Sequence, residues 1–486
     1  MKLSERSLLI QNRDVDSDSL KTNGLSLFFT IICIVDVFGV FPIVALPKAI
    51  IDCGYYGIIL ILIVASSQIY TAILLGRCWI IAEQIEPTIR KKNRYPYSAL
   101  SEFTYGRKLS SLVTILVDFT VFSGGIPNLI VASQNLQLVG LRLTNEHLDI
   151  SFCYWILILG TILCPILWLG SPKDMKWLCS LSALIVISVF LLVNGSLFYQ
   201  SEKEVILNES TPKKSTWEFI LIAYGIVAFQ FDIHPTILNI HVDMKNRKKI
   251  SKAVIFSFLV SLSMFAVTCI NIYLRYGDSL KPSILETLST TIFSHLASIL
   301  VAIQLCLTSA ISNSALYQHL EESLNISREF NHKRCLLRTM LIILAVLIAE
   351  SVPRFDIVMS LIGAALISPL VFILPPLFYL KMVKLQQMHD KGVAMERFTK
   401  SAYCVEESKI EESQDLNIPS DNELIGFFVK RNGRYCSKKF LEFLICCLII
   451  SVSFVCILTS TYLNIIDAIH FGNFSYPCIY NISLLY

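Results

Sequence analysis

Charge is scarce in this sequence of 486 residues. Only 16% of the residues are Asp, Glu, Lys or Arg, whereas 54% are hydrophobic, and the mean hydropathy is +0.62. Soluble domains carry about 25% charged residues. The composition therefore excludes an ordinary soluble protein and indicates a chain that resides in a lipid bilayer.

Motifs for bond-making chemistry are also missing. The sequence holds no phosphate-binding P-loop, no HExxH helix, no dinucleotide fingerprint and no nucleophile elbow. An ATP-driven pump or an enzyme of these classes is therefore excluded, and we expect no catalytic residue, no metal and no organic cofactor. The net charge of +4 comes from basic clusters that flank membrane segments, so we expect no nucleic-acid partner.

A disulfide framework is not expected either, although the chain has 15 cysteines. Most of them lie inside apolar segments, where cysteine behaves as a small hydrophobic residue. Only Cys53, Cys153 and Cys478 fall near the membrane side opposite the N-terminus. A bridge among these three stays an open alternative.

Long apolar runs dominate what is present. A helix crosses a bilayer with about 20 apolar residues, and eleven stretches of the sequence qualify. They are residues 25–50, 56–79, 109–139, 152–169, 177–197, 219–237, 253–273, 288–316, 336–349, 357–379 and 440–463. The predicted fold class is an all-α membrane protein with eleven transmembrane helices.

The spans divide the chain into a tail (1–24), a ten-helix core (25–384), a loop (385–439), an eleventh helix (440–463) and a second tail (464–486). The loop carries the acidic stretch CVEESKIEESQDL and no apolar periodicity, so we expect no second core there. The first apolar run is too long for the core of a signal peptide, so we expect the first helix to be retained.

Lysine and arginine set the orientation of membrane proteins. All but eight of the 41 lie on the side that holds the N-terminus, which predicts a cytosolic N-terminus. The opposite side then carries glycosylation sequons at Asn208, Asn473 and Asn481. The membrane itself is left open, because ERSLLI at residues 5–10 resembles an endolysosomal sorting signal and the plasma membrane is the alternative.

The first span is interrupted near its centre by Asp36, Gly39 and Pro42. The bilayer core offers no partner for freed backbone groups, so a break there is tolerated only where it lines a cavity. The sequence therefore predicts a binding site inside the membrane. Asp36 is a candidate to bind a proton, a sodium ion or a substrate ammonium, and the alternative is that it caps the unwound backbone.

The sixth span holds Gln230, Asp232 and His234 directly before Pro235. Proline removes a backbone donor and disfavours helix at the residue before it, which predicts a second broken helix. His234 is a candidate proton-coupling group, with Asp232 as its partner or alternative. The competing interpretation is a histidine that is hydrogen-bonded for structure alone.

Further candidates lie in the third and eighth spans. Asp118 in the third span either faces a cavity as a coupling group or lies in a helix contact near the small residues Gly124 and Gly125. In the eighth span, Ser309 and Asn313 belong to a polar stripe. They either line a substrate path or hold helices together.

Six segments are similar to the amino acid/auxin permease family, which includes vesicular inhibitory, proton-coupled and neutral amino acid transporters. They are FGVFPIVALPKAIIDCGYYG, YTAILLGRCW, YPYSALSEFTYG, HPTILNIHVDMKNRKKISKAV, YLRYGDSLKPSILETL and DIVMSLIGAALISPLVFILPPLFYLK, in the family's order. The resemblance covers residues 25–380. It implies the leucine-transporter-type fold, with two inverted five-helix repeats whose first and sixth helices are broken, plus an extra helix.

The resemblance also implies a substrate site built on the backbone of the two breaks. The implied substrate-binding residues are Val37, Phe38, Gly39, Val40, Phe41, Tyr224, Gly225 and Phe229, with Gln230, Ser309 and Asn313 among those that set specificity. Asp36 stands where many members have asparagine, and Asp232 and Ile233 replace a small pair. Substrate identity is therefore not inherited from any subgroup.

The predicted function is symport of a small amino acid with a proton by alternating access, with sodium as the alternative coupling ion. The runner-up is an amino-acid sensor that transports little and signals through its cytosolic segments. A passive channel is disfavoured because it needs no pair of broken helices. The oligomeric state is not predicted.

Overall fold

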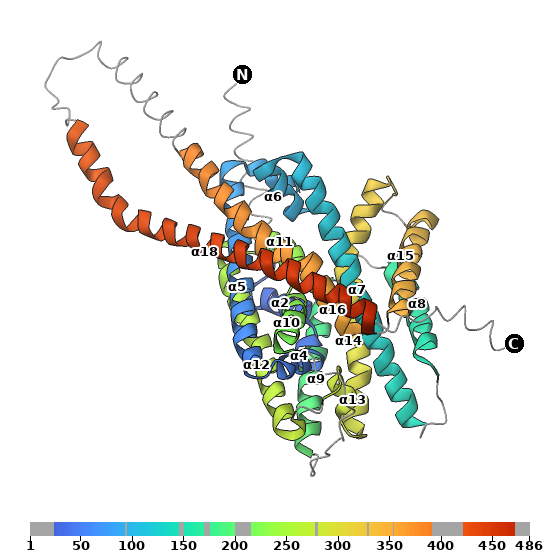
Figure 1. The fold of residues 1–486 in the computed structure, drawn as a ribbon. Coiled ribbons are helices and arrows are strands. Elements are labelled where there is room, and N and C mark those ends of the chain that lie inside the picture. Colours follow the sequence, from blue (N-terminus) through green and yellow to red (C-terminus); the bar gives the residue numbers. More distant parts are fainter. Residues whose placement is uncertain are drawn as a thin grey trace, which may run out of the picture.

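The computed structural model describes residues 24–92, 95–144, 150–169, 175–199, 215–277, 280–327, 330–352, 354–390 and 421–471. These residues form a bundle of helices (Figure 1). Their β structure is limited to one bridge between Leu25 and Met244. The predicted all-α membrane class is confirmed.

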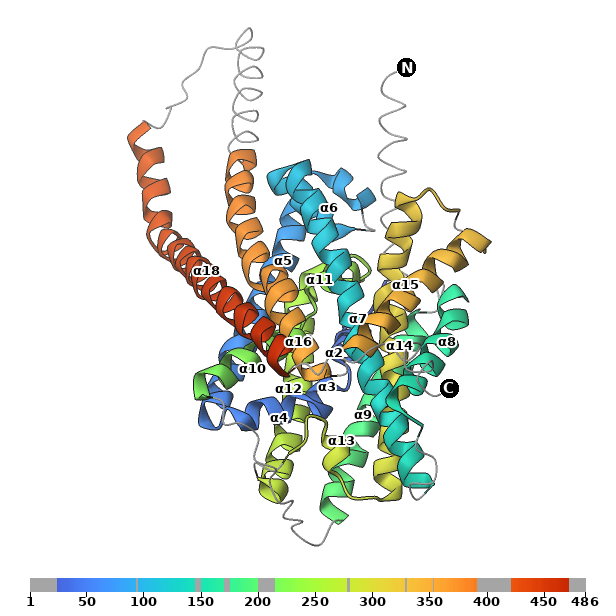
Figure 2. The ribbon, with the colours of Figure 1, turned by 45° about the vertical axis from the view of Figure 1, so that its right-hand side comes forward.

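The first half of the bundle begins with a broken helix. This first half comprises α2 (Leu27–Phe38), α3 (Phe41–Val44), α4 (Leu46–Asp52), α5 (Tyr55–Ile85), η1 (Pro87–Lys92), α6 (Pro96–Tyr105), α7 (Arg107–Leu143), α8 (Phe152–Leu169) and α9 (Met175–Tyr199). We call the end of the bundle where α2 begins, and where α6 lies, the N-terminal face; it is uppermost in Figure 2.

The second half also begins with a broken helix. This second half comprises α10 (Thr216–Gln230), α11 (His234–Val242), η3 (Arg247–Lys249), α12 (Ile250–Tyr276), α13 (Ile284–Thr287), α14 (Ile292–Ser323), α15 (His332–Ser351), α16 (Phe355–Ile362) and two π-helical turns, η4 (Gly363–Ile367) and η5 (Pro369–Ile373). The tenth span then continues as helix to Asp390. Helix α18 (Asp421–Phe471) lies outside both halves, against α10 and α16.

Eight helices of the described residues are long and apolar enough to cross a membrane. The other three predicted spans are also helical, but each departs from a simple span. The first is broken into α2, α3 and α4; the fourth, α8, is short; and the ninth, α15, carries several charged residues, among them the buried Arg338 and Glu350.

Close backbone contact holds the second broken helix, at α10, against the tenth span. A Cβ atom at Gly225 would lie 2.2 Å from the Ser360 carbonyl oxygen, and one at Gly363 would lie 1.9 Å from the Gly225 carbonyl oxygen. Helices in lipid gain no hydrophobic driving force from each other, so contacts of this kind depend on residues without side chains. Glycine at both positions therefore fixes how α10 crosses the tenth span.

Helix α6 lies on the N-terminal face and is joined to the tenth span by hydrogen bonds. The Tyr97 hydroxyl donates to the Leu370 carbonyl at 2.6 Å, and the Tyr105 hydroxyl donates to the Leu377 carbonyl at 3.2 Å. Leu370 lies in the π-helical turn η5, where the regular bonding of an α-helix is interrupted. The Tyr97 bond thus ties α6 to a fully buried residue of this turn.

Some predictions fall outside the described residues. These are the tail 1–23, the middle of the loop predicted at 385–439, and the sequons at Asn208, Asn473 and Asn481. Of the three cysteines considered for a bridge, Cys53 is a free thiol and Cys153 is disulfide-bonded. Cys478 also lies outside the described residues.

Candidate functional site: a cavity between two helix breaks

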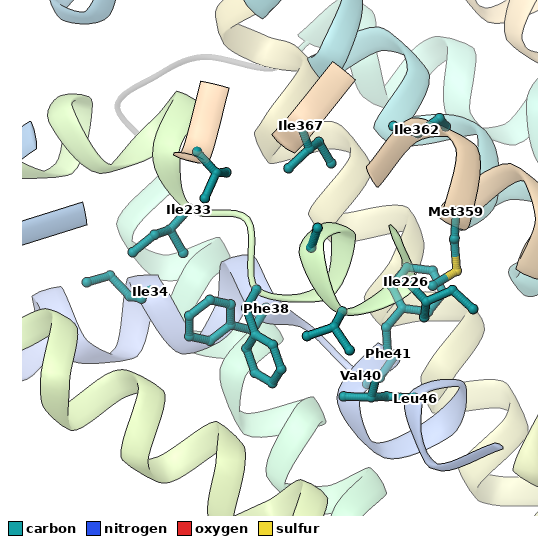
Figure 3. Close-up of a cluster of buried hydrophobic side chains, with 14 of the residues drawn as sticks. Ile34, Phe38, Val40, Phe41, Leu46, Ile226, Ile233, Met359, Ile362 and Ile367 are labelled. Carbon is teal, nitrogen blue, oxygen red and sulfur yellow. The ribbon is translucent and has the colours of Figure 1, made fainter. Parts of the chain in front are cut away.

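The first break is centred on Gly39. Helix α2 ends there with φ 62° and ψ −152°, a conformation that essentially only glycine adopts. The chain resumes at Phe41, and Pro42 lies in the first turn of α3, where the missing N–H costs no helix bond. Figure 3 shows this break, with Phe38 and Phe41 on its two sides.

The second break separates α10 from α11 at residues 231–233. The Asp232 carboxylate closes it by accepting a hydrogen bond from the His234 backbone N–H at 3.1 Å, and Pro235 occupies the first turn of α11. Aromatic pairs join the two breaks: the Phe38 and Phe231 ring centroids are 5.3 Å apart, and those of Phe41 and Phe229 are 6.1 Å apart.

A cavity of about 110 Å³ lies between the breaks. Four elements surround it, and the tenth span adds Ile367. The first break contributes Val37, Phe38, Gly39 and Phe41; α7 contributes Thr120, Val121, Gly124, Gly125 and Asn128; the second break contributes Phe229, Gln230, Asp232, Pro235 and Thr236; and α14 contributes Gln304, Leu305, Thr308, Ser309, Ser312 and Asn313. The two interruptions thus share one intramembrane chamber.

Several polar atoms in the cavity wall have no hydrogen-bond partner among the described residues. They are both amide atoms of Gln230, Oε1 of Gln304 and Oδ1 of Asn313. Gln230 is only 3% exposed and Gln304 is fully buried. Buried polar groups are nearly always hydrogen-bonded, because leaving them bare costs about 1–3 kcal/mol each. The wall is therefore equipped for a polar ligand.

The remaining polar groups of the wall hold one another in place. Asn128 donates to the Ser309 hydroxyl at 2.9 Å, which joins α7 to α14. Gln304 donates to Thr308 at 2.6 Å and to Ser182 of α9 at 3.4 Å. These bonds orient the unpaired Oε1 of Gln304 beside Gly39, whose Cβ position is 3.4 Å away from it.

Asp232 and His234 form a chain that leads away from the cavity. Asp232 lines the cavity, and its Oδ1 lies 3.7 Å from the His234 Nδ1 atom. His234 is fully buried, and its Nε2 lies 3.0 Å from the hydroxyl of Thr71 on α5. Of Asp232, His234 and Thr71, only Asp232 lines the cavity and can touch a ligand directly.

Asp36 is buried on the other side of α2 and does not line the cavity. The side chains of Ser182 and Cys179 on α9 face its carboxyl group, and its Oδ1 has no hydrogen-bond partner among the described residues. Ser182 also contacts Gln304. The carboxyl group therefore reaches the cavity wall through one intervening hydroxyl.

Asp118 lies outside the cavity wall, toward the N-terminal face, and forms an ion pair with His319 of α14. The other candidates that do not line the cavity have structural surroundings. Val40 is fully buried within the first break, Tyr224 packs against Phe372, and Gly225 forms the close crossing with Ser360.

The polar residues of this region that were not predicted include Thr71, Asn128, Gln304 and His319. Thr71 and Asn128 carry no local signal, since single hydroxyl or amide groups are common in membrane helices. Gln304 and His319 did have one, because they extend the polar stripe of the eighth span at helical spacing: His319 lies seven residues after Ser312. Within the described residues, no cluster of three or more His, Cys, Asp or Glu could hold a metal ion.

Two broken helices that enclose a cavity at the centre of a helical bundle define the leucine-transporter type of secondary transporter. Residues 25–405 match the family described as transmembrane amino acid transporter protein. Because the match spans well over half of the chain, the protein belongs to this family of membrane transporters.

Two relatives from Arabidopsis thaliana illustrate the similarity. Amino acid transporter AVT1J is 26% identical over 70% of this chain and 78% of its own length, and amino acid transporter AVT1I is 23% identical over 76% and 89%. Among solved structures, MhsT in complex with L-phenylalanine aligns with a TM-score of 0.47 and 12% identity, over 76% of this chain and 97% of that one.

Proposed function

We propose that this protein carries a small amino acid across the membrane together with a proton, by alternating access around the cavity between the two breaks. The observation that carries the proposal is the set of unpaired amide atoms on Gln230, Gln304 and Asn313 in the wall of a buried cavity. A zwitterionic amino acid supplies both donors and acceptors to such a wall. Backbone groups freed at the breaks add to both sets.

The size and composition of the cavity favour a small substrate. Its volume of about 110 Å³ is roughly ten times the room that one water molecule requires. The rings of Phe38, Phe41 and Phe229 close the wall next to the breaks. A bulky side chain would have to displace these rings, so small amino acids are the class that we assign.

Asp232 and His234 are the groups that we assign to proton coupling. Asp232 is the only acidic residue in the cavity wall, so a proton that binds there removes an uncompensated charge from the membrane interior. His234 contacts the Asp232 carboxylate and Thr71 contacts the His234 imidazole, so the polar contacts continue from Asp232 into the protein interior. Asp36 is assigned a supporting role, because it acts on Gln304 through Ser182.

The orientation and the membrane complete the proposal. The excess of lysine and arginine toward the N-terminal face favours a cytosolic position for that face. In that orientation Asn208, Asn473 and Asn481 are glycosylation sites. The plasma membrane and an endolysosomal or vesicular membrane are distinguished by locating the tagged full-length protein in cells.

The test is uptake of labelled amino acids into proteoliposomes that contain the purified protein. A proton gradient, a sodium gradient and no gradient are compared for each amino acid. We expect saturable uptake that an inward proton gradient drives above equilibrium. Saturable binding without accumulation under any gradient would overturn the symport proposal in favour of a sensor, and accumulation only with sodium would replace the coupling ion.

A conservative variant locates the substrate in the cavity. Gln230→Leu keeps the side-chain volume and removes both unpaired amide atoms, so we expect KM to rise about tenfold, which corresponds to roughly 1.4 kcal/mol. Gln318→Leu is the matched control, because Gln318 lies on α14 outside the cavity wall and bonds to Ser314. An unchanged KM in Gln230→Leu would place the substrate elsewhere.

A further inference from the structure

An ion pair lies between the cavity and the N-terminal face. It joins Asp118 of α7 to the Nδ1 atom of His319 on α14. The side chains of Asp118 and His319 are 20% and 23% exposed, so both groups are mostly covered. This is the point where the two cavity-lining helices approach the N-terminal face.

The pair lies on the same helix faces as the cavity wall. Asp118 precedes the wall residues Val121 and Gly125 by three and seven residues, and His319 follows Ser312 by seven. Positions seven apart share one face of an α-helix. With a rise of about 1.5 Å per residue, Asp118 lies only about 4.5 Å from the wall residue Val121 along α7, on the side of the N-terminal face. The pair therefore lies on the cavity side of both helices, between the wall and the N-terminal face.

Other groups around His319 define its surroundings. The Tyr95 ring, from the segment just before α6, covers the imidazole with a centroid distance of 4.6 Å. Glu322, three residues further along α14, is the second carboxylate that acts on it. The imidazole thus faces two carboxylates and one aromatic ring, an environment in which a bound proton is compensated.

Helix packing alone does not account for the pair. The α7 and α14 helices are already joined by the Asn128–Ser309 hydrogen bond and by the close approach of Gly125 to Asn313. Partly exposed ion pairs contribute only about 0–1 kcal/mol to stability. A histidine beside a carboxylate, however, is the side-chain combination that exchanges protons near neutral pH.

We propose that Asp118 and His319 are the site from which the coupled proton leaves toward the N-terminal face. The neutral imidazole accepts the proton that crosses the cavity from Asp232, and the resulting imidazolium is balanced by the Asp118 carboxylate. Loss of that proton to water on the N-terminal side restores the neutral imidazole and the carboxylate. This inference rests on the proposed proton symport.

The test separates net transport from exchange. Net accumulation requires the carrier to release its proton, whereas exchange of external labelled for internal unlabelled substrate proceeds with the proton still bound. We expect His319→Gln to lower proton-driven accumulation at least tenfold and to leave exchange within about twofold of wild type. Asp118→Asn is expected to have the same pattern. His295→Gln, at the opposite end of α14 and outside the cavity wall, is the matched control.

Each outcome decides between the alternatives. Wild-type accumulation in both His319→Gln and Asp118→Asn would overturn the inference. An equal loss of accumulation and exchange in folded protein would also overturn it, because that pattern indicates a structural role. Failure of the proposed function has a different signature, since the wild-type protein itself would then show no proton-driven accumulation.

Discussion

The substitution Gly39→Ala tests how the first helix break shapes the site. At φ 62° and ψ −152°, a side chain costs about 1–3 kcal/mol in backbone strain. The new Cβ would also lie 3.1 Å from Nε2 and 3.4 Å from Oε1 of Gln304. The fully buried Gln304 amide has to move by a few tenths of an ångström, which disturbs its bonds to Thr308 and Ser182.

A second glycine separates strain from site geometry. Gly54, between α4 and α5, has φ 57° and ψ −137°, and nothing lies within 4 Å of its Cβ position. Gly54→Ala therefore carries a similar strain without touching the cavity. We expect both variants to lose thermal stability, Gly39→Ala more than Gly54→Ala, and only Gly39→Ala to raise KM for uptake, by about tenfold or 1.4 kcal/mol. The assay is saturation uptake together with thermal unfolding of the purified proteins. Equal KM values in the two variants would refute the placement of Gln304 in the substrate site.

Two further substitutions test the packing that positions the site. Gly225→Ala forces α10 away from the Ser360 carbonyl, and overpacking of this kind costs about 1–3 kcal/mol, so we expect a lower unfolding temperature. Gly195→Ala is the control, because open space lies at its Cβ position, and we expect it to be neutral or slightly stabilising. Equal unfolding temperatures of the two variants would contradict the close crossing. Tyr97→Phe removes the hydrogen bond to the buried Leu370 carbonyl, so we expect the free energy of unfolding in detergent to fall by about 1–3 kcal/mol. An unchanged free energy of unfolding would mean that this bond does not hold α6 to the tenth span.

The spans and the two breaks could be predicted from sequence because their causes are local. An apolar run must enter the bilayer, and Gly39 and Pro235 each favour a helix break by their own backbone chemistry, although Pro127 lies inside the continuous helix α7. A hydropathy count includes the first, fourth and ninth spans, but it does not show that the first consists of three short helices.

The pairing of side chains within the site could not be predicted, because it depends on contacts between distant parts of the chain. Asp118 and His319 are 201 residues apart, and Thr71 and His234 are 163 apart. Sequence reasoning identified Asp118 and His234 as titratable groups in the membrane. It named Asp232 as the partner or alternative of His234, which the structure places 3.7 Å away, but it gave no means of finding the distant partners His319 and Thr71. Which helix faces meet is decided by packing of the whole bundle.

The same limit applies to residues assigned to the substrate by resemblance. Gly225 was expected to offer its backbone to a ligand, yet its carbonyl lies against the tenth span. Asp36 lies beside the first break, as expected, but its side chain faces Cys179 and Ser182 rather than the cavity. A position in a motif predicts that a residue lies near a break, but only the packed structure shows which side of the helix faces the cavity.

The most direct test of the account is proton movement that substrate itself induces. Proteoliposomes with a pH-sensitive dye inside are prepared at equal internal and external pH, without sodium, and the amino acid that supports uptake is added outside. The account predicts internal acidification that saturates with the KM of uptake and that is lost in Asp232→Asn. Substrate entry with no change in internal pH would contradict it.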